Sequence, residues 1–137
     1  MKRFYQILRT GLVLVCMLSF SACFPGGEKV FTDLSEAQIA ALETMVGIPF
    51  PEDMTIEKCR YAEAAGDITV TVYARYPHAA FRKYIQSLND DNIRDLGDIY
   101  HVGDIDATIS LEYGEGQIRM TVIDPSAANF SPLLNAE

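Results

Sequence analysis

Residue types that commonly carry out catalysis are sparse in this chain. It contains two histidines, His78 and His101, and three cysteines. Cys59 could form a catalytic pair with a histidine, because such residues meet in space and not along the chain. The sequence has neither a Gly-x-Ser-x-Gly nucleophile motif nor a glycine-rich phosphate loop. We therefore predict a protein that is not an enzyme, with no catalytic residue and no cofactor. A small hydrolase that uses Cys59 or His101 is the least favoured alternative.

Aspartates are dense in one segment, and carboxylate oxygens are the ligands that calcium requires. An EF-hand loop that began at Asp90 would have Arg94 and Asp95 at its fifth and sixth positions, where an oxygen ligand and a glycine are needed. A zinc site would need four clustered nitrogen or sulfur ligands. We predict no metal site and interpret the carboxylates as solvated, with weak calcium binding as the alternative. The segment contains Asp90, Asp91, Asp95, Asp98, Asp104 and Asp106.

Four polar residues form the predicted binding surface. Thr71, Tyr73 and Arg75 alternate with apolar residues, so they share the polar face of a predicted strand. Arg119 lies on the polar face of another predicted strand. Tyr and Arg are enriched at the energetic centres of protein interfaces, which favours a binding role. Ordinary cross-strand packing on an exposed face is the alternative.

The first 22 residues have the pattern of an export signal. Residues 1–10 contain three basic residues and no acidic residue, residues 11–20 are largely apolar, and residues 21 and 22 are small. A permanent membrane anchor is the alternative, but the apolar run is about half of the roughly 20 residues that a membrane-spanning helix needs.

The sequence that ends this leader, Phe20-Ser21-Ala22-Cys23, is similar to the lipobox of bacterial lipoproteins. That family usually has leucine at the first of these positions, where this chain has phenylalanine. The resemblance implies that Cys23 is lipidated, becomes the new N-terminus, and anchors the protein to the cell membrane or the outer membrane, outside the cytoplasm. Cys59 would then be an unpaired thiol and would need to be buried. The alternative is ordinary signal-peptide cleavage to a secreted or periplasmic protein, in which Cys23 and Cys59 could form a disulfide.

Charge is divided unequally between the leader and the rest of the chain. All 19 acidic residues lie from Glu28 onward, whereas three of the 11 Lys and Arg residues lie within the first nine positions. Removal of those three charges changes the formal charge from -8 to -11. Nucleic-acid binding requires a basic footprint, so this charge disfavours a nucleic-acid partner. It also disfavours attachment through anionic lipid headgroups.

Two helices are predicted by their end signals. Residues 33–47 contain a capping box formed by Ser35 and Gln38, and Gly47 provides a left-handed stop. The second helix begins at Pro77, whose missing N–H is tolerated in a first turn, and ends at Asn89. Both helices have one apolar stripe, and we expect them to pack on a sheet. For the first helix, docking on a partner protein is the alternative.

Strands are predicted by alternation of apolar and polar residues. They cover residues 54–62, 67–76, 98–102, 105–113 and 117–122, with a bulge near Lys58 and hairpin turns at residues 64–67 and 114–116. The polar face of the resulting sheet is predicted to carry Thr69, Thr71, Tyr73, Arg75, Asp106, Thr108, Ser110, Glu112 and Arg119.

These elements predict an α+β domain of two layers, with an antiparallel sheet of four to five strands and two helices packed on one face, in the order α-β-β-α-β-β-β. Residues 1–22 are the expected signal peptide, residues 23–32 the lipidated cysteine and a flexible tether, residues 33–124 the domain, and residues 125–137 a poorly ordered tail. We recognise no family in the domain itself.

The expected function is that of a noncatalytic lipoprotein of the bacterial cell envelope, held to the membrane by its N-terminal lipid. Its domain would bind a protein or another envelope component through the polar sheet face. One alternative is an inhibitor or immunity-type protein, whose acidic surface would block a basic toxin or the cleft of a hydrolase. Another is an accessory subunit that needs the anchor for its position.

Overall fold

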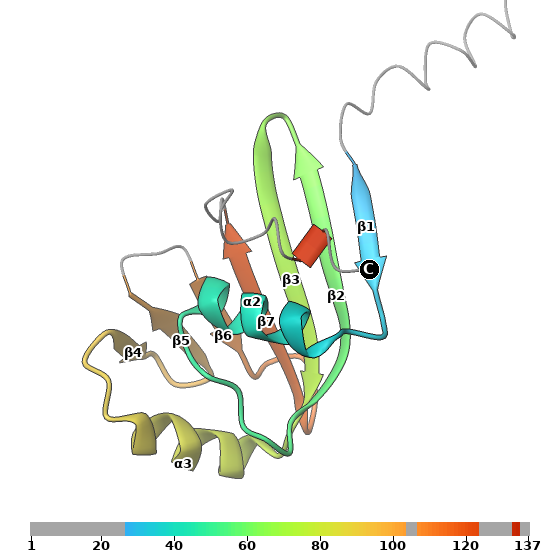
Figure 1. Ribbon diagram of the computed structural model, residues 1–137. Helices are drawn as coiled ribbons and strands as arrows, with labels where there is room; N and C mark the ends of the chain where they lie inside the picture. Colours follow the sequence, from blue (N-terminus) through green and yellow to red (C-terminus); the bar gives the residue numbers. More distant parts are fainter. Residues whose placement is uncertain (1–26, 104–106, 124–132, 135–137) are drawn as a thin grey trace, which may run out of the picture.

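A seven-stranded antiparallel sheet lies at the centre of the computed structural model, which describes residues 27–103, 107–123 and 133–134. Together with the two helices of the described part, it gives an α+β fold (Figure 1). Neighbouring strands follow the order β1-β2-β3-β7-β6-β5-β4. In chain order the elements are β1 (Glu28–Phe31), α2 (Glu36–Val46), β2 (Thr55–Ala64), β3 (Asp67–Arg75), α3 (His78–Leu88), β4 (Ile93–Asp95), β5 (Ile99–Val102), β6 (Ala107–Ser110) and β7 (Gln117–Ile123).

Helix α2 crosses one face of the sheet and has the predicted ends (Figure 1). The Ser35 hydroxyl accepts a hydrogen bond from the Gln38 N–H at 3.3 Å, and the Gln38 side-chain oxygen accepts one from the Ser35 N–H at 2.9 Å. These two bonds complete the capping box. Gly47 ends the helix with a φ of 85°, which a residue with a side chain rarely adopts. Leu42 and Met45 are buried and fix the helix to the sheet.

The hairpin of β2 and β3 turns through two residues. Ala64 and Asp67 are register partners, and Ala65 and Gly66 between them both have positive φ, at 55° and 90°. Positive φ at both central positions is the backbone of the tightest hairpin turn, because it matches the twist of the strands. The predicted turn and the antiparallel pairing are therefore confirmed.

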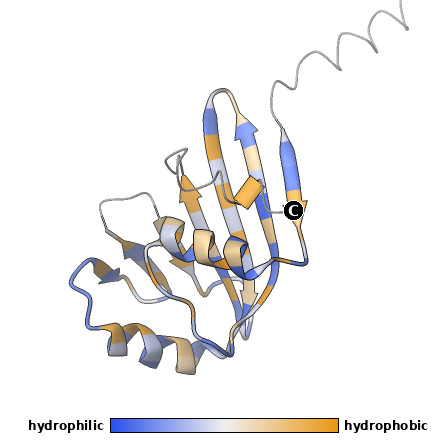
Figure 2. Ribbon diagram, viewed as in Figure 1, coloured by the Kyte–Doolittle hydropathy of each residue, from blue (hydrophilic) through white to orange (hydrophobic). Residues whose placement is uncertain are grey.

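A bulge in β2 sets which residues face the core. The register with β3 shifts between Ile56 and Lys58, which confirms the predicted bulge. Beyond the bulge, Cys59 lies opposite Val72, and both are fully buried. Strand β3 then pairs with β7 and joins the two halves of the chain into one sheet. Along β2, β3 and β7, hydrophobic and hydrophilic residues alternate, so only one face enters the core (Figure 2).

Helix α3 lies at one end of the sheet and closes the core there (Figure 1). Phe81 is fully buried, and its ring meets the ring of Tyr100 in β5 edge-on, with 6.1 Å between centroids. The Tyr84 hydroxyl donates a hydrogen bond of 2.6 Å to the Pro49 carbonyl and links α3 to the segment after α2. Neither α2 nor α3 has the length and apolar character of a helix that could cross a membrane.

The predicted number of strands, four to five, was wrong, because the sheet also has two edge strands. Strand β1 (Glu28–Phe31) lies within residues 23–32, the predicted flexible tether, and pairs with β2. Strand β4 (Ile93–Asp95) lies between the predicted second helix and the predicted strand 98–102, where no strand was expected, and pairs with β5. Both strands are short, and most of their residues are exposed, so they lack the apolar alternation that marks a strand in sequence.

Two further boundaries differ from prediction. Strand β6 ends at Ser110 and not at residue 113. Leu133, which was assigned to a poorly ordered tail, is fully buried, and its carbonyl accepts a hydrogen bond of 3.1 Å from the side-chain amide of Gln38. Leu133 and its neighbour Leu134, which also packs against the core, are adjacent in sequence and show neither the period of a helix nor that of a strand, so periodicity did not indicate this contact. The predicted signal peptide, Cys23, Asp104 and Asp106 lie outside the described residues.

Candidate binding surface on the outer sheet face

The sheet face that points away from the core, here called the outer face, is built from alternate residues of the strands. One row of register partners runs through Lys58, Tyr73, Arg119 and Ser110 on β2, β3, β7 and β6. Both described helices direct their buried side chains into the core on the opposite face. A second row crosses all seven strands and contains Val30, Arg60, Thr71, Thr121, Thr108, His101 and Arg94.

Four side chains of the outer face pack together into a cation–aromatic cluster of Lys58, Tyr73, Tyr113 and Arg119. The Lys58 ammonium lies 4.6 Å from the centroid of the Tyr73 ring. The Arg119 guanidinium carbon lies 4.2 Å from the centroid of the Tyr113 ring. The two rings meet edge-on, with 6.1 Å between centroids and an interplanar angle of 71°. Each cation lies within the distance at which the negative face of a ring attracts it.

Arg119 is the most constrained member of this cluster. Its Nη1 donates a hydrogen bond of 3.0 Å to the Tyr113 hydroxyl. Its Nε is buried and has no hydrogen-bond partner among the described atoms. A buried donor without an acceptor is uncommon in folded proteins and usually has a specific explanation.

The predicted binding residues are brought together in part. Thr71, Tyr73 and Arg119 lie side by side on β3 and β7, as the alternation indicated. Arg75 lies on the same face but two residues further along β3. Its guanidinium forms an ion pair with Glu57 at the bulge, with 2.7 Å between Nη2 and Oε1.

Two members of the cluster, Lys58 and Tyr113, were missed. Lys58 reaches the outer face because the bulge shifts the register of β2. Its alternation with Cys59 and Tyr61, both buried, was the signal that could have placed it there. Tyr113 is the last residue of the predicted strand 105–113, and its alternation with Glu112 of the predicted polar face placed it on the core-facing side. That assignment was wrong, because β6 ends at Ser110 and the following turn brings the Tyr113 ring against Arg119.

The Cys59 and His101 pair that a hydrolase would need is not formed. Cys59 is fully buried on the core side, and burial raises the pKa of its thiol to about 12. His101 alternates with the buried residues Tyr100 and Val102, so its side chain belongs to the outer face. The sheet separates the two side chains, and a thiol with so high a pKa is a poor nucleophile.

Three of the described aspartates of the calcium hypothesis, Asp90, Asp95 and Asp98, serve local structure. Asp90 accepts hydrogen bonds from the backbone and the side chain of Asn92, both at 2.9 Å. Asp95 accepts one from the Gly97 N–H at 2.8 Å. Asp98 forms an ion pair with Arg82 of α3. Among the described residues, no three acidic, histidine or cysteine side chains lie close enough together to bind a metal ion.

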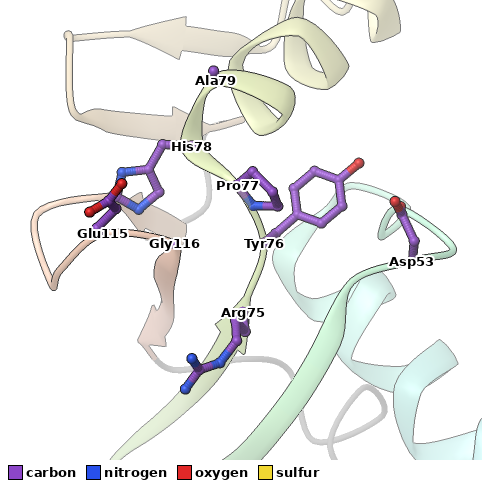
Figure 3. Close-up of a pocket in the computed structure, with 8 residues that line it drawn as sticks. All are labelled: Asp53, Arg75, Tyr76, Pro77, His78, Ala79, Glu115 and Gly116. Carbon is purple, nitrogen blue, oxygen red and sulfur yellow. The ribbon is translucent and has the colours of Figure 1, made fainter.

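A cleft of about 610 Å³ lies where β3 leads into α3, between the start of the helix and the loop that precedes β7 (Figure 3). His78 is in this cleft, and its Nε2 lies 2.8 Å from the Gln117 carbonyl oxygen. A carbonyl only accepts hydrogen bonds, so Nε2 carries a proton and donates. The interaction holds the first turn of α3 to β7 and occupies this nitrogen.

Two other polar groups of the cleft also have partners within the chain. Tyr76 points toward Asp53 in Figure 3, and its pKa is raised by desolvation and by its hydrogen bond to that carboxylate. Arg75 is paired with Glu57. His78, Tyr76 and Arg75 of the cleft thus have partners, whereas the outer face holds Arg119 Nε, a buried donor without a partner among the described residues, and this makes the outer face the stronger candidate for a binding site.

No protein-family model, curated protein sequence or solved structure matches this chain.

Proposed function

We propose that this chain is a lipid-anchored protein of the cell envelope whose domain binds a protein or another envelope component and performs no catalysis. The observation that carries the proposal is the cation–aromatic cluster on the outer face. Tyr and Arg dominate binding energy at interfaces, because they combine a large apolar area with directional donors. Tyr113 is about half exposed, so it offers such area to a partner.

The environment of Cys59 supports the lipoprotein part of the proposal. A lipid on Cys23 would leave Cys59 without a disulfide partner outside the cytoplasm, where exposed thiols are oxidised. Cys59 is fully buried, and its raised pKa keeps it in the unreactive thiol form. A single buried thiol is therefore compatible with an oxidising compartment.

The charge of the outer face bears on the inhibitor alternative. That alternative required an acidic surface to block a basic toxin. The cluster instead presents the positive charges of Lys58 and Arg119. The geometry thus favours a partner that brings negative groups to this face over a basic toxin.

Site-specific photo-crosslinking in intact cells tests the binding role. Tyr73 is replaced by p-benzoylphenylalanine in the full chain, and Gln86, an exposed residue of α3, is replaced in the matched control. We expect a crosslinked species of defined mass from position 73 and none from position 86. Equal crosslinking from both positions, or none from either, would contradict the proposal.

Mass spectrometry of the full chain extracted from membranes tests the anchor. We expect a diacylglycerol adduct on Cys23, and we expect it to disappear in the Cys23→Ser variant together with membrane association. A disulfide between Cys23 and Cys59 would show instead that the protein is exported without a lipid.

A further inference from the structure

Basic residues gather on the outer face although the chain as a whole is acidic. Two of them are neutralised by ion pairs, Arg60 with Glu28 and Arg75 with Glu57. The remaining three, Lys58, Arg94 and Arg119, have no ion pair with any described residue. The outer face therefore presents unpaired positive charge on a chain with a formal charge of -8. Of the eight Lys and Arg residues that follow the predicted leader, five lie on this face: Lys58, Arg60, Arg75, Arg94 and Arg119.

Arg119 combines this charge with unused hydrogen-bonding capacity. Tyr113 occupies its Nη1, whereas the buried Nε has no acceptor within the described part of the chain. The Nε and Nη2 edge of a guanidinium matches the two oxygens of a carboxylate, which can accept both hydrogen bonds at once. A carboxylate at this edge would supply the acceptor that Nε lacks.

Building on the function proposed above, we propose that the cation–aromatic cluster binds a carboxylate-bearing segment of a partner protein, with Arg119 as the residue that pairs with the carboxylate. Lys58 provides a second positive charge on the same row of the sheet, on the other side of Tyr73. The Tyr73 ring between them provides apolar area for the rest of the segment. Tyr113 lies on the loop between β6 and β7 and accepts a hydrogen bond from Nη1, which is not part of the Nε and Nη2 edge.

The number of unpaired charges favours a protein over a polyanion. Duplex binding commonly neutralises roughly six to ten phosphates, and anionic membranes are recognised by clusters of about four to eight basic residues. The outer face has three basic residues that form no ion pair with the described part of the chain, and the chain as a whole carries a negative charge that repels such polymers. A protein interface needs only one or two charge-assisted hydrogen bonds at its centre, supported by aromatic contacts.

Binding of defined probes to the full chain in detergent tests this assignment. The main probe is an acetylated and amidated octapeptide of alternating Asp and Val, and its matched control has Asn in place of Asp. Affinity is measured by fluorescence anisotropy, and the environment of Arg119 is followed by the NMR signal of its Nε–H group. We expect saturable binding of the Asp peptide with a shift of that signal, and at least tenfold weaker binding of the Asn peptide.

Variants of the chain separate a specific site from general attraction between charges. Arg119→Gln should weaken binding of the Asp peptide at least tenfold, whereas Arg94→Gln, the same charge change elsewhere on the outer face, should weaken it less than threefold. Arg119→Lys keeps the charge but loses the planar donor pair and should also weaken binding. If Arg119→Gln does not fold, the comparison of the Asp and Asn peptides on the unaltered chain still decides.

Several results would overturn the inference. Three concern the peptides: equal binding of the Asp and Asn peptides, no saturable binding at millimolar peptide, or an equal loss of binding in the Arg119→Gln and Arg94→Gln variants. The fourth is obtained with phosphatidylglycerol vesicles as a second probe: binding of the vesicles without binding of the Asp peptide. Crosslinking from position 73 in cells together with one of these results would keep the proposed binding role and reject the carboxylate. Absence of that crosslink would reject the binding role itself.

Discussion

The side-chain amide of Gln38 in α2 donates a hydrogen bond of 3.1 Å to the carbonyl oxygen of Leu133, 95 residues later in the chain. The oxygen of the same side chain accepts the Ser35 N–H of the capping box. Gln38 is buried, and its bond to Leu133 is buried with it, so bulk water does not compete for that bond. One side chain therefore caps a helix and fastens a distant segment to it.

Replacement of Gln38 by alanine should destabilise the protein by about 1–3 kcal/mol, because it leaves a buried carbonyl without a donor and removes half of the capping box. The free energy of unfolding in urea measures the effect. Gln86→Ala, at an exposed position of α3, is the control and should change that free energy by less than about 0.5 kcal/mol.

A second variant separates the two roles of Gln38. Gln38→Glu keeps an oxygen for the Ser35 N–H but has no amide donor for the Leu133 carbonyl. If the long-range bond matters, this variant should lose at least as much stability as Gln38→Ala. Retention of full stability in Gln38→Glu would assign the effect to the cap alone.

The centre of the fold was predictable from sequence because its signals are local. Ser35 and Gln38 form a capping box within one turn, and Lys58 marks the bulge by a break in alternation. The contact of Leu133 depends on two segments that meet only after folding. The edge strand β1 likewise owes its pairing to β2 and not to its own residues.

The thiol of Cys59 should make stability depend on pH in the alkaline range. Its pKa is raised from 9.0 to about 12 by burial, so the unfolded chain loses this proton first as pH rises. The stabilising contribution is fully present below pH 9 and is lost progressively toward pH 12. The free energy of unfolding should therefore fall more between pH 8 and pH 11 in the unaltered chain than in Cys59→Ala.

The comparison with Cys59→Ala also controls for the tyrosines, which titrate in the same range and are present in both proteins. An equally steep decline in the two proteins would show that the Cys59 thiol does not contribute. Alkylation gives an independent check. At pH 8, iodoacetamide should modify Cys59 only when urea is present, as read by peptide mapping.

One substitution in the turn between β2 and β3 should increase the stability of the protein. Ala65 has a φ of 55°, which is costly for a residue with a Cβ atom, whereas Asn tolerates this region and Asn-Gly is the preferred pair in this turn. Ala65→Asn should raise the free energy of unfolding by about 0.5–1 kcal/mol.

Gly66 provides the opposite test of the same turn. Its φ is 90°, and a Cβ atom there would meet nothing within 4 Å. Gly66→Ala should therefore lower the free energy of unfolding by about 1–2 kcal/mol through backbone strain alone. Equal stability of both variants and the unaltered chain would mean that the turn relaxes without cost.

The candidate site was predictable only where a strand is regular. Thr71, Tyr73 and Arg119 alternate with buried residues, and sequence placed them on one face. Tyr113 follows the end of β6, and past that point alternation no longer determines direction. Its contact with Arg119 is set by the turn and by the ring packing, which sequence periodicity does not encode.

The ion pair between Glu28 and Arg60 should be visible in the acid titration of Glu28. Arg60 donates two hydrogen bonds to this carboxylate, at 2.8 and 3.0 Å, and these bonds hold the pKa of Glu28 below its ordinary value of 4.5. The pair favours the folded state above that value and loses its effect as the pH falls through the lowered pKa. Carbon-13 NMR of the Glu28 carboxyl should therefore give a midpoint below 4.5.

Removal of the Arg60 guanidinium should bring the pKa of Glu28 back toward its ordinary value. In Arg60→Gln we expect the Glu28 midpoint to rise, because both hydrogen bonds are lost. Lys29→Gln removes the same charge next to Glu28 in sequence, but Lys29 alternates to the other side of β1 and should leave the midpoint nearly unchanged. An equal rise in both variants would attribute the lowered pKa to net charge and not to the paired geometry across β1 and β2.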